Sequence, residues 1–377
     1  MNAYLAFITS GVAIIGAGLA LTRAADAISA RTRLGGTVRH RHPGGAAISA
    51  RTRLGAVGVG GILLAAGTSL PEMVASVSAA RVGLPEIAAG NLFGSNLFNI
   101  MTIALADAVY RKRSIIHDAA PGHLLSAAVG MLLMVLAALG ILLRLDLEVL
   151  GAGVDALAIL AIYVFGSWLL NAFEARPQTR PRQGNSGRGA PAQESSMRAT
   201  DAAGQPERGE EPHEPSPKKV RSLGQAAAGF VGGAAVIVVA GTLLTRSAEG
   251  IVQQTGLSAG FVESGLVAAA TSPSEMTTCI AAANIGAINL ALGNALGSNL
   301  FNMAVLFFAD AAHRPGPLLT AVSQAHAVAA MFALLMSAVV LIGLFYRSRR
   351  KVGNLGIESI MIVGLYLLVT WFLFGRG

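Results

Sequence analysis

The chain has 377 residues, of which 53% are hydrophobic and only 13% carry a charged side chain. Soluble globular proteins carry roughly 25% charged residues, so the composition excludes a soluble enzyme. The formal net charge of +8 could suggest a nucleic-acid partner. The basic residues, however, fall between long apolar runs and have no aromatic residues interleaved with them, so we expect no nucleic-acid binding. The single cysteine, Cys279, excludes an internal disulfide and a metal site built from several thiolates.

Long apolar runs predict an all-α membrane protein with ten transmembrane helices, because about 18 or more apolar residues are typical of one span. The first run could be a signal peptide, since Ala24 to Ala27 resemble a cleavage site. No basic residue precedes this run and a related segment recurs later, so we interpret it as a retained helix. In chain order the predicted spans are 4–22, 55–80, 87–108, 120–143, 148–173, 222–245, 260–284, 288–309, 318–346 and 355–375.

Basic residues predict the orientation of these spans. The loops after the first, third, fifth and ninth spans hold 7, 3, 9 and 4 Lys or Arg residues, which is 23 of the 28 in the chain. Loops rich in Lys and Arg stay on the cytoplasmic side. We therefore expect a multi-pass protein of the cell membrane with both termini outside and these four loops in the cytoplasm.

The longest loop, residues 174–221, contains seven Pro, nine basic and seven acidic residues and no aromatic residue. Such a composition buries too little apolar surface to offset the entropy of ordering, so we expect a disordered cytoplasmic linker. It divides the chain into a first five-helix repeat, residues 1–173, and a second, residues 222–377.

The two halves share an internal repeat. A shift of 203 positions aligns 67–107 with 270–310, with 18 identities in 41 positions, and both copies contain the letters GSNLFN. Because each half has five predicted spans, an odd number, the copies must insert with opposite orientation. This inverted-topology arrangement occurs in many secondary transporters, whose sites lie at the repeat interface.

A second, shorter repeat lies within the first half. Residues 27–35 and 47–55 both read AISARTRLG, and they are 20 positions apart. Upstream of this point, residues 17–26 match 240–249 at a shift of 223 rather than 203. We interpret the 20 additional residues as a tandem duplication that lengthened the loop after the first span.

Polar residues recur four positions apart within the repeated segments, so on a helix they share one face. One set is Thr68 with Glu72, followed on the next span by Asn91, Ser95 and Asn99. The second half repeats the pattern with Thr271 and Glu275, then Asn294, Ser298 and Asn302. Hydroxyl, amide and carboxylate oxygens suit hard cations such as Na⁺ and Ca²⁺.

The alternative interpretation is that these residues only hold helices together. Gly90 and Gly94 have the spacing of a close helix contact, and for such glycines we favour packing. Glu72 and Glu275 are different, because a carboxylate within the bilayer costs roughly 3 kcal/mol or more and defaults to a functional role. Prolines beside them, Pro71 and Pro273, should break their helices and free backbone carbonyls for an ion.

Other ionisable residues in the spans have weaker claims. Asp107 and Asp310 match each other, but they lie at span ends, which favours interfacial anchoring or capping. Asp155 and Glu263 lie near outer span ends with no partner in the other half, so we interpret both as interfacial. His123 and His326 lie in apolar runs without nearby carboxylates, so we expect both to be buried packing residues.

The paired motifs GTSLPE with GNLFGSNLFN, and ATSPSE with GNALGSNLFN, resemble the two repeats of the sodium/calcium exchanger family within the calcium/cation antiporter superfamily. The resemblance covers nearly the whole chain and implies a ten-helix inverted-repeat fold. It implies that Glu72 and Glu275 are shared Ca²⁺/Na⁺ carboxylates and that no cofactor is used. The same resemblance implies further ion contacts from Thr68, Ser69, Ser95, Asn99, Thr271, Ser272, Ser298 and Asn302.

Two positions depart from the family pattern. Potassium-dependent relatives carry Asp where this chain has Asn302, so the amide favours potassium independence. In the second motif Pro273 stands two residues before the glutamate and Ser274 takes the usual place of the proline. We therefore expect an altered backbone there and a less secure ion contact from Ser272.

The sequence predicts a secondary antiporter that exchanges Na⁺ for Ca²⁺ by alternating access within a lipid bilayer. A proton/cation antiporter on the same scaffold remains open, because burial disfavours the charged form of a carboxylate and lets H⁺ compete for Glu72 and Glu275. A cation channel is less favoured, since two inverted halves around one acidic pair are typical of transporters.

Overall fold

The computed structural model describes residues 2–32, 68–110, 114–174, 223–257, 259–347, 351–353 and 355–375. Three parts of the sequence interpretation lie outside these ranges. They are the second copy of the duplicated segment, most of the predicted linker, and the start of the second predicted span before Thr68.

The first half is built from helices. It contains α1 (Ala3–Thr32), α3 (Leu70–Arg81), α4 (Pro85–Val109), α5 (Gly122–Leu143) and α6 (Val154–Glu174), with a short hairpin of β1 (Glu148–Val149) and β2 (Ala152–Gly153) before α6.

The second half repeats this order with one long segment divided into several pieces. It contains α7 (Leu223–Thr255), α8 (Ala259–Phe261), the π-helix η2 (Val262–Val267), α9 (Ala268–Thr271), α10 (Pro273–Asn284), α11 (Ile288–Ala312), the 3-10 turn η3 (Leu318–Thr320), α12 (Gln324–Tyr346), β3 (Lys351–Val352), β4 (Leu355–Gly356) and α13 (Ile357–Gly375).

In the described part of the chain, seven helices are long and apolar enough to cross a membrane. They are α4, α5, α6, α7, α11, α12 and α13, and two shorter apolar segments are Ala3–Gly18 and Val262–Thr271. Within their most apolar windows, 72% of the residues of α4 and of α11 are buried, against 22% in α6 and α7. The chain is therefore a multi-pass membrane protein in which α4 and α11 form the centre.

Two predicted spans begin later than expected, because hairpins occupy their first residues. Residues 148–153 pair as β1–β2 and residues 351–356 pair as β3–β4. Each hairpin turns through a residue with positive φ, Leu150 at 56° and Gly353 at 63°. A count of apolar residues does not detect such a turn, so the prediction extended both helices too far.

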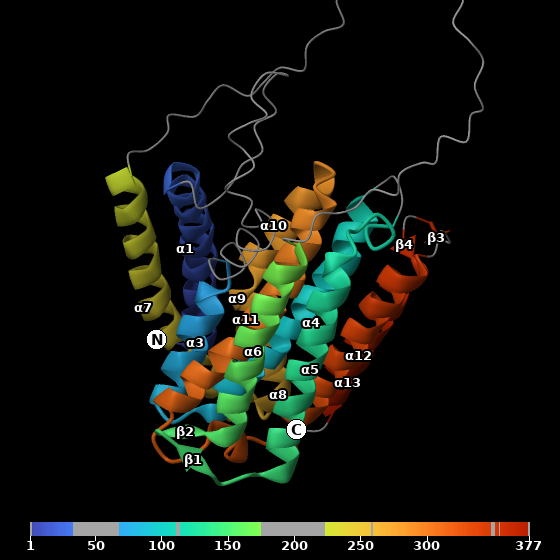
Figure 1. Ribbon diagram of the computed structural model, residues 1–377. Helices are drawn as coiled ribbons and strands as arrows, with labels where there is room; N and C mark the ends of the chain where they lie inside the picture. Colours follow the sequence, from blue (N-terminus) through green and yellow to red (C-terminus); the bar gives the residue numbers. More distant parts are fainter. Residues whose placement is uncertain are drawn as a thin grey trace, which may run out of the picture.

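The first helix of each half is longer than predicted. Helix α1 continues to Thr32 and α7 to Thr255, about ten residues beyond the apolar runs. The α1 extension contains four alanines, which have the highest helix propensity, so this helix continues beyond the apolar run. The two helices lie side by side at one edge of the bundle (Figure 1).

Backbone conformations repeat at the same offset of 203 positions, well beyond the segment in which residue identities are frequent. The residues that cap the C-terminal ends of α5 and α12 both have a left-handed backbone conformation. They are Arg144 with φ 49° and Arg347 with φ 50°. The hairpins also follow this offset, since β1–β2 and β3–β4 differ by 203 positions throughout. These equivalent hairpins lie at opposite ends of the bundle (Figure 1).

Candidate functional site

Two equivalent breaks in the helices create the centre of the candidate site. Ser69 precedes α3 with φ −91° and ψ 11°, and Ser272 separates α9 from α10 with φ −90° and ψ 11°. The expectation of an altered backbone in the second motif was therefore wrong. Pro71 and Pro273 both fall in the first two positions of their helices, where a missing N–H breaks no helical hydrogen bond. Moving the proline by one position therefore leaves the backbone unchanged.

Each break leads directly into a glutamate. Glu72 lies in the first turn of α3 and Glu275 in the first turn of α10, and both are fully buried. The N-terminus of a helix carries a partial positive charge that stabilises a carboxylate. The short helices therefore hold two carboxylates inside the protein.

Hydrogen bonds cross between the two motifs. Ser69 Oγ donates to Glu275 Oε1 at 2.8 Å, and Ser272 Oγ donates to Glu72 Oε1 at 2.8 Å. Each serine therefore contacts the glutamate of the other half. The expectation of a less secure role for Ser272 has no support in this geometry, because its contact matches that of Ser69.

Asn91 on α4 and Asn294 on α11 hold the same two helix breaks through a further set of hydrogen bonds. Asn91 Nδ2 donates to the Glu72 carbonyl at 3.3 Å, and Asn294 Nδ2 donates to the Glu275 carbonyl at 3.2 Å. Their amide oxygens accept hydrogen bonds from the threonines, at 3.0 Å from Thr271 and 3.2 Å from Thr68. Both amide groups are thus used in holding the breaks against the central helices.

The remaining predicted residues line the same buried region. The hydroxyl oxygens of Ser272 and Ser95 lie 3.0 Å apart, and those of Thr68 and Ser298 lie 3.4 Å apart. Asn99 and Asn302 are also fully buried. Side-chain contacts thus join eight of the ten predicted residues between α3, α4, α9, α10 and α11, and Asn99 and Asn302 are buried on α4 and α11.

Several polar atoms in this region have no hydrogen-bond partner among the described residues. They are Glu72 Oε2, both polar atoms of the Asn99 amide, and Asn302 Oδ1. A buried polar atom without a partner costs free energy, and native proteins leave few of them. Oxygens of this kind are suitable ligands for hard cations.

Sequence reasoning missed Ser274 and Asn96. Ser274 Oγ lies 3.1 Å from the Thr68 carbonyl oxygen and 3.2 Å from Glu275 Oε2, two acceptors for its one proton. Asn96 accepts from Asn302 Nδ2 at 3.1 Å through Oδ1. Both had a signal in the sequence, since Ser274 replaces a proline of the first motif and Asn96 belongs to the repeated letters GSNLFN.

Asp107 and Asp310 anchor loops at the ends of the central helices, in agreement with the predicted capping role. Each carboxylate accepts one backbone N–H from the turn eight residues later and one from a hairpin glycine. The donors are Ile115 (2.7 Å) and Gly356 (2.8 Å) for Asp107, and Leu318 (2.6 Å) and Gly153 (2.7 Å) for Asp310.

The interpretation of the other ionisable residues needs two corrections. Asp155 does have a counterpart, Glu358, which lies 203 positions later at the start of α13 and is also buried. His326 does have carboxylates nearby, since its Nε2 lies 2.7 Å from Glu86 Oε2 and 3.4 Å from Glu263 Oε2.

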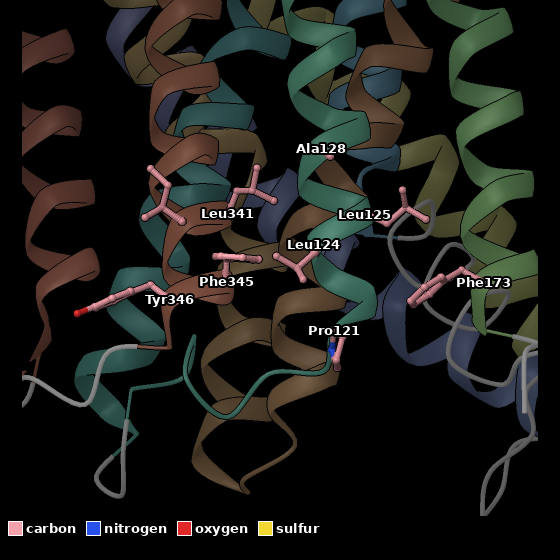
Figure 2. A pocket seen from close by; sticks show the side chains of 9 residues that line it. Pro121, Leu124, Leu125, Ala128, Phe173, Leu341, Phe345 and Tyr346 are labelled. Carbon is pink, nitrogen blue, oxygen red and sulfur yellow. The ribbon is translucent and has the colours of Figure 1, made fainter. Parts of the chain in front are cut away.

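A separate apolar groove of about 760 Å³ opens between α5, α6 and α12 (Figure 2). Apart from the phenol of Tyr346, its walls are hydrocarbon, so it offers no carboxylate for a cation. Its lining residues are Pro121, Leu124, Leu125, Ala128, Phe173, Leu341, Ile342, Phe345 and Tyr346.

Comparisons with known proteins agree with this architecture. A family model described as "Sodium/calcium exchanger protein" matches residues 2–170 and 225–375. The human sodium/potassium/calcium exchanger 5 is 39% identical over 61 residues, a match that covers 16% of this chain and 12% of the human protein.

Two solved structures share the fold. The sodium–calcium exchanger NCX_Mj aligns at 17% identity with a TM-score of 0.55 and covers 98% of each chain. The H⁺/Ca²⁺ exchanger CAX aligns at 11% identity with a TM-score of 0.64 and covers 100% of this chain and 85% of its own. At these identities the likeness concerns the fold alone.

Proposed function

Because this chain belongs to the sodium/calcium exchanger family, we propose that it is a secondary active transporter that exchanges Na⁺ for Ca²⁺ by alternating access. The family consists of exchangers, so the protein moves ions and makes or breaks no covalent bond. The observation that carries the proposal is the pair of crossing hydrogen bonds, from Ser69 to Glu275 and from Ser272 to Glu72. They place one acidic centre between two halves of the chain.

Glu72 and Glu275 are the proposed primary ligands. Two carboxylates supply a charge of −2, which balances one Ca²⁺. In the ion-bound state the serine hydroxyls would turn their lone pairs toward the cation. The proposed site is completed by side-chain or carbonyl oxygens of Thr68, Ser69, Ser95, Asn99, Thr271, Ser272, Ser298 and Asn302.

The neutral oxygens favour Na⁺ over H⁺ as the exchanged ion. A proton needs only one basic oxygen, which either carboxylate could supply. Hydroxyl and amide oxygens are too weakly basic to hold a proton at neutral pH, whereas they coordinate metal cations well. Among the residues that the structure describes, the Asn99 amide and Asn302 Oδ1 have no hydrogen-bond partner, which supports metal ions at several positions around the pair.

The two halves, residues 1–173 and 222–377, are proposed to be five-helix repeats of inverted topology, joined by a cytoplasmic linker over 174–221. The offset of 203 positions that the hairpins share, and their location at opposite ends of the bundle, support this arrangement. It places both termini outside the cell membrane. Because either half can open toward its own side, one central site can face each side of the membrane in turn.

The crossing hydrogen bonds give alternating access a physical basis. Each glutamate is held by its own short helix and by a serine of the other half, so an ion at either carboxylate contacts both halves. With no cation, two buried negative charges repel each other and oppose closure. Occupancy by Ca²⁺ or Na⁺ neutralises them and permits the change between inward and outward states.

The test is ⁴⁵Ca²⁺ uptake into proteoliposomes that contain the purified full-length chain. Uptake driven by an outward Na⁺ gradient, at equal pH on both sides, supports the proposal. Uptake driven only by a pH gradient would identify a proton antiporter instead. Saturable exchange separates both from a channel, in which Ca²⁺ would follow its own gradient without any counter-ion.

The proposed topology has its own test. Single cysteines at Ser186 and Ala312, in a Cys279→Ala background, should react with a membrane-impermeant maleimide from opposite sides. Labelling of both positions from one side would contradict the five-plus-five inverted arrangement.

A further inference from the structure

A second buried cluster of titratable side chains joins the two halves of the chain, and the ion-exchange site uses none of its members. Glu86 lies in the first turn of α4, Glu263 in the π-helix η2, and His326 in the first turn of α12. His326 Nε2 lies 2.7 Å from Glu86 Oε2 and 3.4 Å from Glu263 Oε2. One imidazole nitrogen therefore faces two carboxylates.

The surroundings hold these three side chains in place. The Ser323 amide donates to Glu86 Oε1 at 2.9 Å, which leaves Oε2 directed at the histidine. Gly90 lies one helical turn after Glu86, and a Cβ there would come within 2.5 Å of Glu263 Cβ and 3.0 Å of His326 Cε1. Only a glycine lets the three side chains converge. The π-helix that carries Glu263 is a feature found frequently at functional sites.

The cluster contains a buried ligand atom without a hydrogen bond. Glu263 Oε2 has no hydrogen-bond partner among the described residues, although the Glu263 side chain is only 5% exposed. One ligand atom from each residue, two oxygens and one nitrogen, lies within 4.8 Å of the other two. Zn²⁺ binds His nitrogen and carboxylate oxygen at about 2.0–2.2 Å, so these atoms need only small movements to share one ion.

We propose that Glu86, Glu263 and His326 form a binding site for a borderline transition-metal dication of the Zn²⁺ or Co²⁺ class. The imidazole sets the preference, because nitrogen ligands suit Zn²⁺, Co²⁺ and Ni²⁺, whereas Ca²⁺ takes oxygen ligands. Three protein ligands leave one position for water. The side chain of Glu86, 36% exposed, connects the cluster to the protein surface.

The other half of the chain supplies an internal contrast. His123 is the counterpart of His326, and Asn289 is the counterpart of Glu86 at the same offset of 203 positions. Asn289 Oδ1 accepts from the Ala120 amide at 2.9 Å, just as Glu86 accepts from Ser323. The counterpart of Glu263 is Gly60, which has no ligand atom. By sequence, the three equivalent positions of the first half therefore carry one imidazole and one amide but no carboxylate.

A metal ion in this site would join α4 of the first half to η2 and α12 of the second. These elements belong to different halves, so the ion would act as a clamp between them. Binding to the folded state alone stabilises it by RT ln(1 + [L]/Kd), so the melting temperature rises with the concentration of the metal ion. The site is therefore detectable without any measurement of transport.

The experiment titrates Co²⁺ into the purified full-length protein in detergent, with millimolar Ca²⁺ present to occupy Glu72 and Glu275. The expected result is a saturable visible absorption band at one equivalent, together with a higher melting temperature in Zn²⁺. His326→Gln and Glu263→Gln should each weaken Co²⁺ binding at least tenfold. His123→Gln is the matched control and should bind Co²⁺ as the wild type does.

Glu86→Gln provides a ligand variant at a partly exposed position, in case the buried replacements do not yield folded protein. It too should weaken Co²⁺ binding at least tenfold. A folded wild-type protein with no saturable Co²⁺ band and no Zn²⁺-dependent rise in melting temperature would overturn the proposal. Equal Co²⁺ affinity in the wild type and the Glu86→Gln variant would overturn it as well, and the cluster would then be an ion pair between the halves.

Discussion

Ser272 donates a hydrogen bond of 2.8 Å to Glu72, although the two residues stand 200 positions apart in the chain. The same contact recurs in reverse between Ser69 and Glu275. The glutamate on each short helix is thus held by the serine at the helix break that precedes the other short helix.

The two serines should contribute equally to Ca²⁺ affinity. A hydrogen bond to a charged group is worth about 1.5–3 kcal/mol, so Ser69→Ala and Ser272→Ala should each weaken apparent Ca²⁺ affinity roughly tenfold or more. Concentration dependence of ⁴⁵Ca²⁺ exchange in proteoliposomes measures the effect. Ser337→Ala, at a buried position on α12, is the control and should leave the affinity unchanged. A large loss of Ca²⁺ affinity in Ser69→Ala but not in Ser272→Ala would contradict the predicted equivalence of the two serines.

Asn302→Asp should change the ion profile of the transporter. Asn302 Nδ2 now donates to Asn96 Oδ1 at 3.1 Å, which an ionised carboxylate cannot do. A third carboxylate in the centre should also attract an additional monovalent cation or a proton. We expect Ca²⁺ flux that becomes sensitive to K⁺ or is more strongly inhibited by acid. An ion profile identical to that of the wild type would place Asn302 outside the site.

Close packing of α4 against η2 should depend on Gly94. A Cβ at this position would overlap the carbonyl oxygen of Ser264, and overpacking of this kind costs about 1–3 kcal/mol. Gly94→Ala should therefore lower the melting temperature of the purified protein. At Gly293, on α11, a Cβ would lie 3.7 Å from His123 Cε1, an ordinary contact, so Gly293→Ala should melt near the wild type. Similar melting of both variants would exclude this contact as the reason for the glycine.

The duplicated segment should be dispensable. Deleting residues 27–46 joins Asp26 to the second copy, so the chain still reads AISARTRLG after Asp26 and can complete α1 with the same residues. We expect normal insertion and Ca²⁺ exchange. A deletion variant that is stably expressed but inactive would show that the additional 20 residues have acquired a role.

Much of this architecture could be predicted from the sequence, because two signals were strong. Long apolar runs located the seven described helices that are long and apolar enough to cross a membrane. The letters shared between 67–107 and 270–310 identified both buried glutamates and their oxygen-bearing neighbours. Helix ends were less accurate. The start of α6 depends on the β1–β2 turn and on the Gly153 hydrogen bond to Asp310. Neither feature can be recognised from the hydrophobicity of the sequence.

The contacts that escaped prediction join residues far apart in the chain. His326 and Glu86 are 240 positions apart, and neither residue belongs to a motif that the two halves share. The sequence alone therefore gives His326 no acidic neighbour. Asp155 and Glu358 occupy equivalent positions but differ in residue type, so a search for identities could not pair them. Long-range packing decides such contacts, and residue patterns within one half do not report it.

The shared acidic centre is tested most directly by removing one charge at a time. Two unit charges 4 Å apart attract by about 4 kcal/mol at an effective dielectric of ~20, and about 1.4 kcal/mol is a tenfold change in affinity. Glu72→Gln and Glu275→Gln keep size and hydrogen bonding but remove a charge, so each should nearly abolish Na⁺-driven ⁴⁵Ca²⁺ flux. The double variant should be scarcely worse, because groups that act as a unit are non-additive.

The measurement is the initial rate of ⁴⁵Ca²⁺ uptake by the two single variants and the double variant, reconstituted at equal density under one Na⁺ gradient. Asp155→Asn serves as a control at a buried carboxylate outside the centre and should reduce the rate little by comparison. The account predicts near-zero rates for all three glutamate variants. Near wild-type exchange by either single variant, correctly inserted, would contradict the claim that Glu72 and Glu275 form one ion site.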